Sequence, residues 1–464
     1  MPLIIPANSI TGGYEVDNSC RFDDGSSDSL TRTPGSDGDR QKWTTSQWIK
    51  RGNFTGQHQN VFTCGTYSES INIRDDDKVY VQVSNNNTTA VGLMTDRVIR
   101  DPSAWYHIVV ACDTTQGTAS NRLKLYINGV EETSFSQDQR SSITQNMSTA
   151  ICGQFEHRFG KDEGTSNYYN GYLAEAVLID GQALDPTSFG EFDEDSGIWK
   201  PISVSGLTFG TNGFYLDFED SSALGDDVSG NGNDFTVNNL TAIDQSTDTC
   251  TNNFCTMNPL DNFYASSTFS DGNLSLVSGG SGIETYNTST FGLSSGKWYM
   301  ELKHTGGNNV LRQLIGITQN PTDSASQYLG GDNNDSWGYY DNNGNIAHNA
   351  SVVVTYDTWT TNDIIGLALD LDNSRLYFSK NGTWQNSSDP ANGTNGISID
   401  SGYTYYIAWG DLSAGNMNAS FNFGNPPFTI SSGNTDGNGY GNFEYAVPSG
   451  YLSLCTKNLS EVLG

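Results

Sequence analysis

The chain is poor in positive charge. It carries 22 lysine and arginine residues against 53 aspartate and glutamate residues, which gives a formal net charge of −31 at pH 7. A chain this acidic repels nucleic-acid phosphates, so the sequence predicts no nucleic-acid partner. Divalent cations and neutral sugars stay compatible with this charge.

Long apolar runs and a basic leader are also missing. No stretch approaches the about 20 apolar residues that a membrane helix needs, so no membrane insertion is expected. The first residues, MPLIIPANSITGG, have no basic segment and only a short apolar run, unlike a signal peptide. We therefore expect a soluble product made in the cytoplasm.

Cysteine and histidine are scarce and scattered. Seven cysteines in 464 residues do not make a disulfide framework, and most are expected to be buried or idle thiols. Cys250 and Cys255 are close enough in sequence to bridge or to form half of a metal site, but no second pair lies near them. The five histidines have no zinc-binding spacing. His107, inside a predicted strand, is expected to be packed or hydrogen-bonded.

Alternating apolar and polar residues recur along the chain, without a helix-period run of three turns. LKLYINGV (123–130) and SRLYFSKNGT (374–383) both alternate and then reach Asn-Gly, whose positive φ angles suit a tight hairpin turn. One such arm lies in each half of the chain, and we expect each to be an inner hairpin of its own sandwich. The alternative is one large sheet that uses both arms, although each half has enough strands to bury a core alone.

The expected fold is all-β, with two antiparallel β-sandwiches in series. Residues 1–220 form the first sandwich, which the strand-like segment GFYLDFED completes, and residues 283–464 form the second. Residues 221–282 are rich in Asn, Asp, Ser and Thr, and are expected to be an ordered, loop-rich connector.

The two halves resemble different families. The first resembles laminin-G and pentraxin-like domains of the concanavalin type through WTTSQWIKR, WYHIVVACD, LKLYINGV and YYNGYLAEAVLIDGQALDPTSFGE. The second resembles a SPRY domain through GKWYMEL, IGIT, SWGYYDNNGN, DIIGLALDLDNSRLYFSKNG and ASFNFGNPPF. These resemblances imply a concanavalin-like jelly roll followed by a SPRY-type sandwich.

The combination, with the segments IDGQALDP and DDVSGNGNDFTVNNL, also resembles virion proteins of tailed phages, particularly marine ones. The resemblance implies a particle component such as a tail fibre, an appendage or a capsid decoration, and hence localisation to the virion. Other virion proteins and host-cell glycans are the partners that it implies, and a homo-oligomer is compatible with it.

An enzyme would need reactive groups that the sequence does not offer. EFDEDS (191–196) is nearest to the acid pattern of jelly-roll glycosidases, but Ser196 stands in the acid/base position. GLSSG (292–296) matches a nucleophile elbow, yet a strand follows it instead of a helix. No catalytic residue is expected. A purely structural cement protein is the first alternative to adhesion, and a glycan-degrading enzyme the second.

SPRY domains generally bind through loops at one end of the sandwich, which implies a ligand site within residues 330–345 and 381–389. Trp337 and Tyr339 alternate in a predicted strand and are expected in the core. Trp384 follows an Asn-Gly turn and is expected to be exposed. The candidate ligand-binding residues are Asp332, Asn334, Asp335, Asp341 and Trp384.

Calcium is the one cofactor that the sequence leaves open, and none is required. DVSGNG alternates oxygen-bearing side chains as at the start of a calcium loop, but Asn238 stands where an EF-hand has glutamate. The candidate ligands are Asp227, Ser229 and Asn231, with Asp75, Asp76, Asp77 and Asp217 as further candidates. A hydrophilic loop without metal is the alternative. The expected function is non-enzymatic adhesion through sandwich loops, with many weak sites acting together.

Overall fold

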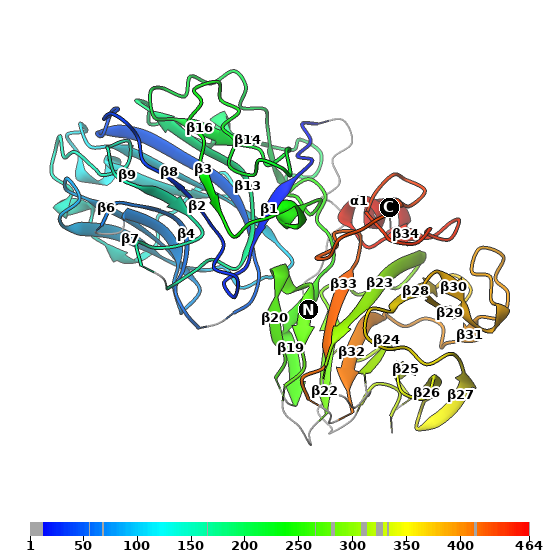
Figure 1. Cartoon of the computed structure of the whole chain (residues 1–464). Helices are drawn as coiled ribbons and strands as arrows, with labels where there is room; N and C mark the ends of the chain where they lie inside the picture. Colours follow the sequence, from blue (N-terminus) through cyan, green and yellow to red (C-terminus); the bar gives the residue numbers. More distant parts are fainter. Residues whose placement is uncertain are drawn as a thin grey trace. The chain divides into compact units, whose positions relative to one another are not determined.

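The computed structural model describes residues 13–463 except 55, 67–68, 165, 265, 280–283, 308–312, 322–327, 332–333 and 413–414. The chain divides after Asn252 into two compact units, here called the N-terminal unit (residues 13–252) and the C-terminal unit (residues 253–463). Each is built almost wholly from antiparallel strands, which confirms the all-β prediction (Figure 1).

Two sheets enclose the main core of the N-terminal unit. The first sheet joins, in order, β10 (Val130–Glu131), β9 (Leu123–Ile127), β8 (Trp105–Asp113), β3 (Lys42–Arg51), β13 (Gly171–Asp180), β1 (Ser19–Phe22) and β18 (Gln245–Ser246), with β16 (Phe214–Leu216) also paired to β13. The second joins β11 (Phe135–Asp138), β7 (Ala90–Val98), β6 (Lys78–Ser84), β5 (Glu69–Ile73), β4 (Gln59–Cys64), β12 (His157–Phe159), β2 (Ser29–Arg32) and β17 (Thr236–Asn238).

Sequence alternation explains how the outer strands face this core. In β9, Leu123, Leu125 and Ile127 are buried while the residues between them are half-buried. β13 is buried along its whole length, because its outer face is also covered. The covering segments include the two-stranded sheet of β14 (Gly190–Phe192) and β15 (Trp199–Pro201), whose Trp199 packs in a cluster with Ala174 of β13. Phe189, Val204 and Phe209 form another small core with Val177 and Ile179.

The C-terminal unit has a second pair of sheets around its own core. One sheet joins β19 (Met257–Tyr264), β22 (Thr285–Ser289), β32 (Tyr406–Asp411), β24 (Gln313–Thr318), β25 (Ser336–Tyr340), β26 (Asn345–His348) and β27 (Ser351–Thr355). The other joins β20 (Thr268–Ser270), β21 (Ser275–Val277), β33 (Asn418–Asn422), β23 (Lys297–Gly306), β28 (Ile364–Asp370), β29 (Arg375–Lys380) and β30 (Thr383–Trp384). β31 (Ile397–Ser398) and β34 (Leu452–Ser453) add to the second sheet, and the helix α1 (Thr456–Leu463) follows.

Both predicted hairpin turns are present. Asn128 and Gly129 have φ angles of 49° and 76°, and Asn381 and Gly382 have φ angles of 48° and 77°. The prediction that these arms are inner hairpins is wrong. Their return strands, β10 and β30, are two residues long and end their sheets in the described part of the chain, so the arms lie at sheet edges.

Residues 221–282 do not lie between the sandwiches as a separate connector. β17 and β18 extend the sheets of the N-terminal unit, and β19, β20 and β21 begin those of the C-terminal unit. The polar composition of this segment fits its place at sheet ends, because such strands expose side chains that central strands bury. In β17, for example, Val237 is 37% exposed.

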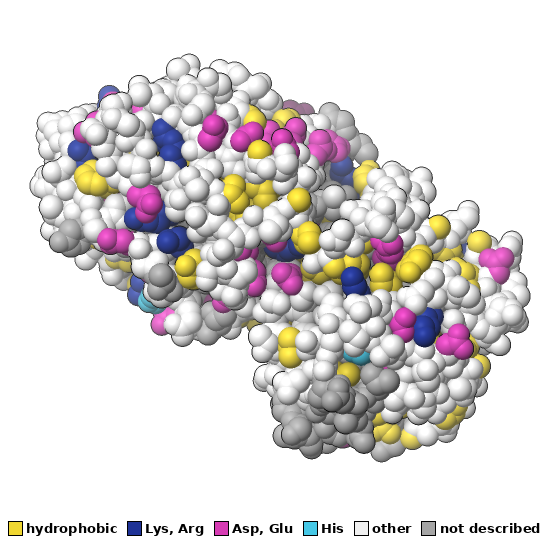
Figure 2. Space-filling model, viewed as in Figure 1, with side chains coloured by type: hydrophobic (Ala, Val, Ile, Leu, Met, Phe, Trp, Pro, Cys, Tyr) yellow, Lys and Arg dark blue, Asp and Glu magenta, His cyan; other side chains and the backbone are white. Residues whose placement is uncertain are grey.

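Uncharged groups dominate the face of the molecule in Figure 2, in keeping with the low content of charged residues. None of the seven cysteines forms a disulfide, and all but the half-buried Cys250 are buried, as expected for most of them. His107 is buried between Ser46 (2.8 Å) and the indole nitrogen of Trp199 (2.9 Å), and burial lowers its pKa to about 3. Within the described residues, no helix has the length and apolar character to cross a membrane.

Candidate functional site

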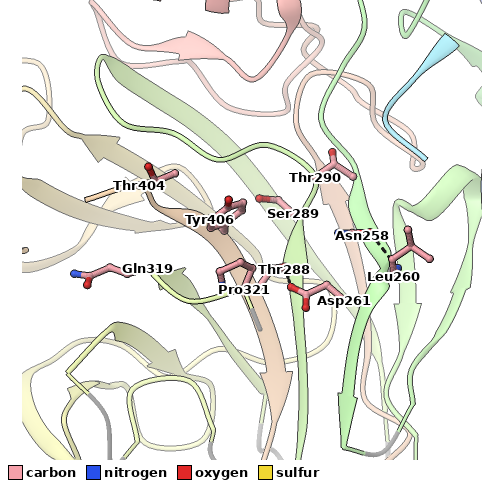
Figure 3. A pocket seen from close by; sticks show the side chains of 10 residues that line it. All are labelled: Asn258, Leu260, Asp261, Thr288, Ser289, Thr290, Gln319, Pro321, Thr404 and Tyr406. Carbon is pink, nitrogen blue, oxygen red and sulfur yellow. Dashed lines mark hydrogen bonds between the residues drawn. The ribbon is translucent and has the colours of Figure 1, made fainter. Parts of the chain in front are cut away.

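A cavity of about 550 Å³ opens on the C-terminal unit, where four segments of the seven-stranded sheet come together. The lining residues come from β19, from β22 and the following Thr290, from the segment after β24, and from the start of β32 (Figure 3). The lining residues are Asn258, Leu260, Asp261, Thr288, Ser289, Thr290, Gln319, Pro321, Thr404 and Tyr406.

A bulge in β19 creates this pocket. Met257 pairs with Ser289 and Asn262 with Asn287, so residues 258–261 stand opposite Thr288 alone. Pro259 has no N–H to give to a neighbouring strand, and such residues are confined to sheet edges and bulges. The Asn258 side chain accepts a hydrogen bond from the backbone N–H of Leu260 at 3.0 Å, which holds the detour in place.

Asp261 is the acidic group of the pocket. Its side chain extends from β19 toward β22, where the Thr288 hydroxyl donates to Oδ2 (Figure 3). Among the described residues, Oδ1 has no hydrogen-bond partner, although the residue is only 3% exposed. Burial raises the pKa of this carboxyl to about 6, and the Thr288 hydrogen bond opposes the rise.

Tyr406 forms the aromatic part of the wall. Burial raises the pKa of its hydroxyl, and the nearby charge of Asp261 adds to the rise. The ring packs over Gly292, where a Cβ atom would come within 2.8 Å of the Tyr406 ring. Gly292 is part of the GLSSG segment, so this glycine makes room for a pocket residue.

Several polar atoms of the pocket are available to a ligand. Within the described part of the chain, the hydroxyls of Thr404 and Tyr406 and the amide nitrogen of Asn258 make no hydrogen bond. Leu260 is 58% exposed and adds apolar surface at the rim. Such a mixture of hydroxyl, amide, aromatic and aliphatic groups suits a small polar ligand with apolar faces.

Only part of the predicted ligand set lies near this pocket. Asn334 is exposed on the loop before β25, and the backbone oxygen of Asp335 accepts from the N–H of Gln319 at 2.7 Å, beside the pocket. Asp341 is fully buried at the far end of β25. Asp332 lies outside the described residues.

The aromatic candidates belong to packed clusters. Trp337 and Tyr339 are in the core, as expected, and Trp337 stacks on His348 with ring centroids 4.0 Å apart. Trp384 is half-buried and packs edge-on against Tyr299 at 6.4 Å, because β30 folds back onto the second sheet. It is therefore not the exposed platform that the sequence predicts.

The pocket residues themselves were missed, because they come from four segments far apart in sequence. The available signal was MNPLDNF (257–263), in which Asn-Pro interrupts alternating apolar residues. A proline inside a strand pattern marks a bulge or an edge. The pattern lies within the stretch that was predicted to be the connector.

The predicted calcium loop is a hydrogen-bonded turn. Asp227 Oδ1 accepts from the backbone N–H groups of Tyr215 and Ser229 at 2.9 Å, and Oδ2 accepts from Ser229 and Asn233. The Asn231 amide donates to two backbone oxygens. In the described residues, no group of three or more His, Cys, Asp or Glu side chains is arranged to hold a metal ion.

The further calcium candidates also have protein partners. Asp77 pairs with Arg51 and Arg100, and Asp76 with Lys78. Asp75 lies 3.7 Å from His58. Asp217 accepts from the N–H of Glu219, and burial raises its pKa.

Comparison with known families divides the chain in the same way. Residues 24–187 match the model described as the concanavalin A-like lectin/glucanases superfamily, and residues 297–389 match the SPRY domain model. No curated protein matches the chain.

Solved structures match part of the chain. The SPRY domain of human HERC1 is 19% identical, and the match covers 36% of this chain and 96% of that one with a TM-score of 0.30. A second human SPRY domain is 14% identical over 36% of this chain and 95% of that one, with a TM-score of 0.25. A heptameric pentraxin from Limulus polyphemus is 15% identical over 37% of this chain and 80% of that one, with a TM-score of 0.27. The two family models show that the protein carries a concanavalin-like domain of the laminin-G type followed by a SPRY domain.

Proposed function

We propose that this protein is a non-enzymatic surface component of a virus particle, and that it binds host-surface glycans through the pocket of its SPRY-type unit. The observation that carries the proposal is the pocket lining. It combines ring-sized apolar surface with hydroxyl and amide groups that have no partner in the described residues. Sugars present the matching surface, because their rings have apolar faces and hydroxyl edges.

The same lining favours binding over hydrolysis. A glycosidase of the usual kind needs two carboxyl groups about 5–9.5 Å apart. Among the described lining residues, Asp261 is the one carboxyl. The EFDEDS segment adds no pair to it, because it belongs to the other unit, where Asp193 accepts hydrogen bonds from Ser196 and Lys200.

The virion part of the proposal rests on the resemblance of IDGQALDP and DDVSGNGNDFTVNNL to phage particle proteins. The seven cysteines form no disulfide, which supports it further, because a protein assembled in a reducing cytoplasm keeps its thiols. Many copies on one particle would turn weak single sites into firm attachment.

A glycan array tests the proposal, with purified protein and a variant that fills the pocket. Thr404 is exposed at the rim, so we expect Thr404→Trp to weaken binding at least tenfold without disturbing the core. The matched control is Thr358→Trp, at an exposed threonine of the same unit outside the pocket. Wild-type protein that binds no glycan but binds purified particles tightly would instead identify a cement protein. New reducing ends after incubation with polysaccharide would identify an enzyme.

Immunogold labelling of particles tests the location. An antibody against the chain is expected to label the particle surface. Label confined to lysate debris would contradict the virion assignment and leave the glycan proposal intact.

A further inference from the structure

Asp261 is a buried acid without a countercharge among the described residues of the pocket lining. Burial and the Thr288 hydroxyl are the two influences on its protonation, and no lysine, arginine or histidine belongs to the described pocket lining. An ionised carboxylate in such a place is costly unless a donor or a cation reaches it.

Another buried acid of the same unit shows the usual arrangement. Glu301 is fully buried, and its two oxygens accept hydrogen bonds from Tyr299, Asn422 and the backbone N–H groups of Glu444 and Tyr445. Asp261 has one hydrogen-bond donor in the described residues, the Thr288 hydroxyl, and Asp261 itself lines a cavity. Because Asp261 lacks the donors that Glu301 has, its second oxygen is a place where a bound ligand can donate a hydrogen bond.

We infer that the pocket takes the protonated amine of an unacetylated amino sugar, with the ammonium group donating to the carboxylate of Asp261. This inference rests on the proposed function, since it names the class of glycan that the pocket binds. A cationic donor gives a stronger hydrogen bond to a carboxylate than a neutral hydroxyl does, and it also neutralises the buried charge.

A sugar fits the rest of the pocket better than a lysine side chain does. The hydroxyls of Thr404 and Tyr406 and the amide of Asn258 are positioned to meet ring hydroxyls, which a lysine side chain lacks. The cavity of about 550 Å³ also lies within the range of roughly 300–1,000 Å³ for small-ligand sites.

A small side-chain movement lets the ammonium reach the acid. The last torsion of an aspartate side chain is broad, so the carboxyl group can turn about its Cβ–Cγ bond at little cost. We expect this turn to bring the oxygen that has no donor toward the cavity while the other oxygen keeps its hydrogen bond from Thr288.

The groups around Asp261 also set its pH dependence. The Thr288 hydroxyl on β22 donates to it, the titratable group of Tyr406 on β32 lies in the same lining, and Gln319 and Pro321 line the pocket without charge. The Asp261 carboxyl has a pKa of about 6, so it loses its charge as the pH falls below that value. Amine binding is therefore expected to weaken below about pH 6.

Titration calorimetry with short oligosaccharides tests the inference. The probes are a β-1,4-linked glucosamine tetramer, its fully N-acetylated form and a neutral glucose tetramer. At pH 7 we expect the glucosamine form to bind at least tenfold more tightly than the other two, and Asp261→Asn to abolish that preference.

The matched control is Asp357→Asn, at an exposed acid of the same unit outside the pocket. Both variants remove one negative charge from a chain of net charge −31, so they separate a specific contact from general attraction of a polycation. An equal effect of the two variants would overturn the inference.

Three further outcomes test this inference and the proposed function against each other. Acetylated or neutral tetramers that bind as tightly as the amine, and are blocked by Thr404→Trp, would overturn the inference and support a glycan pocket. If none of the three tetramers binds and the glycan array shows no binding, both the inference and the proposed glycan-binding function are overturned. Lysine amide binding as tightly as the glucosamine tetramer would keep the amine contact and overturn the sugar assignment.

Discussion

Both units have a similar Asn-Gly hairpin at a sheet edge, but a buried acid has different partners in each. Asp248 of the N-terminal unit is fully buried and pairs with the equally buried Lys50 at 2.7 Å, while the Trp105 indole donates to its second oxygen at 3.0 Å. Asp261 of the C-terminal unit has the Thr288 hydroxyl alone in the described residues. A satisfied buried acid contributes to the fold, whereas an unsatisfied one beside a cavity is a candidate for function.

The largest expected effect is a loss of stability when Asp248, the buried acid with a buried lysine partner, loses that partner. Lys50→Met leaves the Asp248 carboxylate buried without its cation, so we expect the N-terminal unit to lose about 3–5 kcal/mol of stability. Urea unfolding followed by tryptophan fluorescence measures this loss. Replacing both residues, by Met and Leu, is expected to recover most of it.

A matched substitution in the other unit sharpens the comparison. Lys297 pairs with the buried Asp370 at 3.1 Å, but its side chain is 28% exposed and water can solvate the acid's partner. Lys297→Met should therefore cost less than Lys50→Met. Equal losses would show that burial of the lysine does not decide the strength of these pairs.

Removing the charge of Asp261, which has a single hydrogen-bond donor among the described residues, should raise the stability of the protein instead of lowering it. The pKa of Asp261 is raised from 3.8 to about 6, so its ionisation is harder in the folded state and stability falls as the pH rises through that interval. Asp261→Asn removes this penalty. We expect the variant to be about 2 kcal/mol more stable than the wild type at pH 8 and nearly equal at pH 4. Melting curves at both pH values test this, and a variant that is less stable at pH 8 would contradict it.

The hairpin turns offer a smaller test. Gly129 packs under the ring of Trp199 and Gly382 under the ring of Tyr445, and both have positive φ angles. Each Gly→Ala change is expected to cost about 1–2 kcal/mol for the backbone conformation. Gly129→Ala should cost more, because Trp199 is buried and donates to His107, whereas Tyr445 is half-buried and can turn aside. Thermal unfolding of both variants ranks them.

The smallest expected effect concerns calcium. The oxygens of Asp227 already accept hydrogen bonds from the protein, and calcium would have to displace those donors. We therefore expect the melting temperature in excess calcium to match that in EDTA. A rise with calcium that Asp227→Asn abolishes would establish the metal site that the sequence leaves open.

Much of the fold could be predicted because local patterns decide it. Alternation in LKLYI and Asn-Gly at 128–129 give a strand and a turn whatever their surroundings. The position of that hairpin in its sheet could not be predicted in the same way. It depends on which strands pair over long distances, and here the return strand is too short to receive another neighbour.

The site was less predictable than the fold. Trp384 follows an Asn-Gly turn, which favours exposure, but β30 returns onto a sheet whose aromatic side chains receive its ring. Asp261 looked like one acid among many in a polar stretch. Its proposed role depends on Thr288, Thr404 and Tyr406, which approach it only after β19, β22 and β32 have paired in one sheet.

The position of β1 has a consequence for synthesis on the ribosome. Ser19 and Cys20 pair with Ser246 and Gln245, so a strand made at the start waits for one made more than two hundred residues later. At roughly 5–20 residues per second, its open edge is exposed for at least ten seconds while translation proceeds. Nascent chains halted before residue 245 should accordingly recruit chaperones or associate with one another, and those released after residue 252 should not.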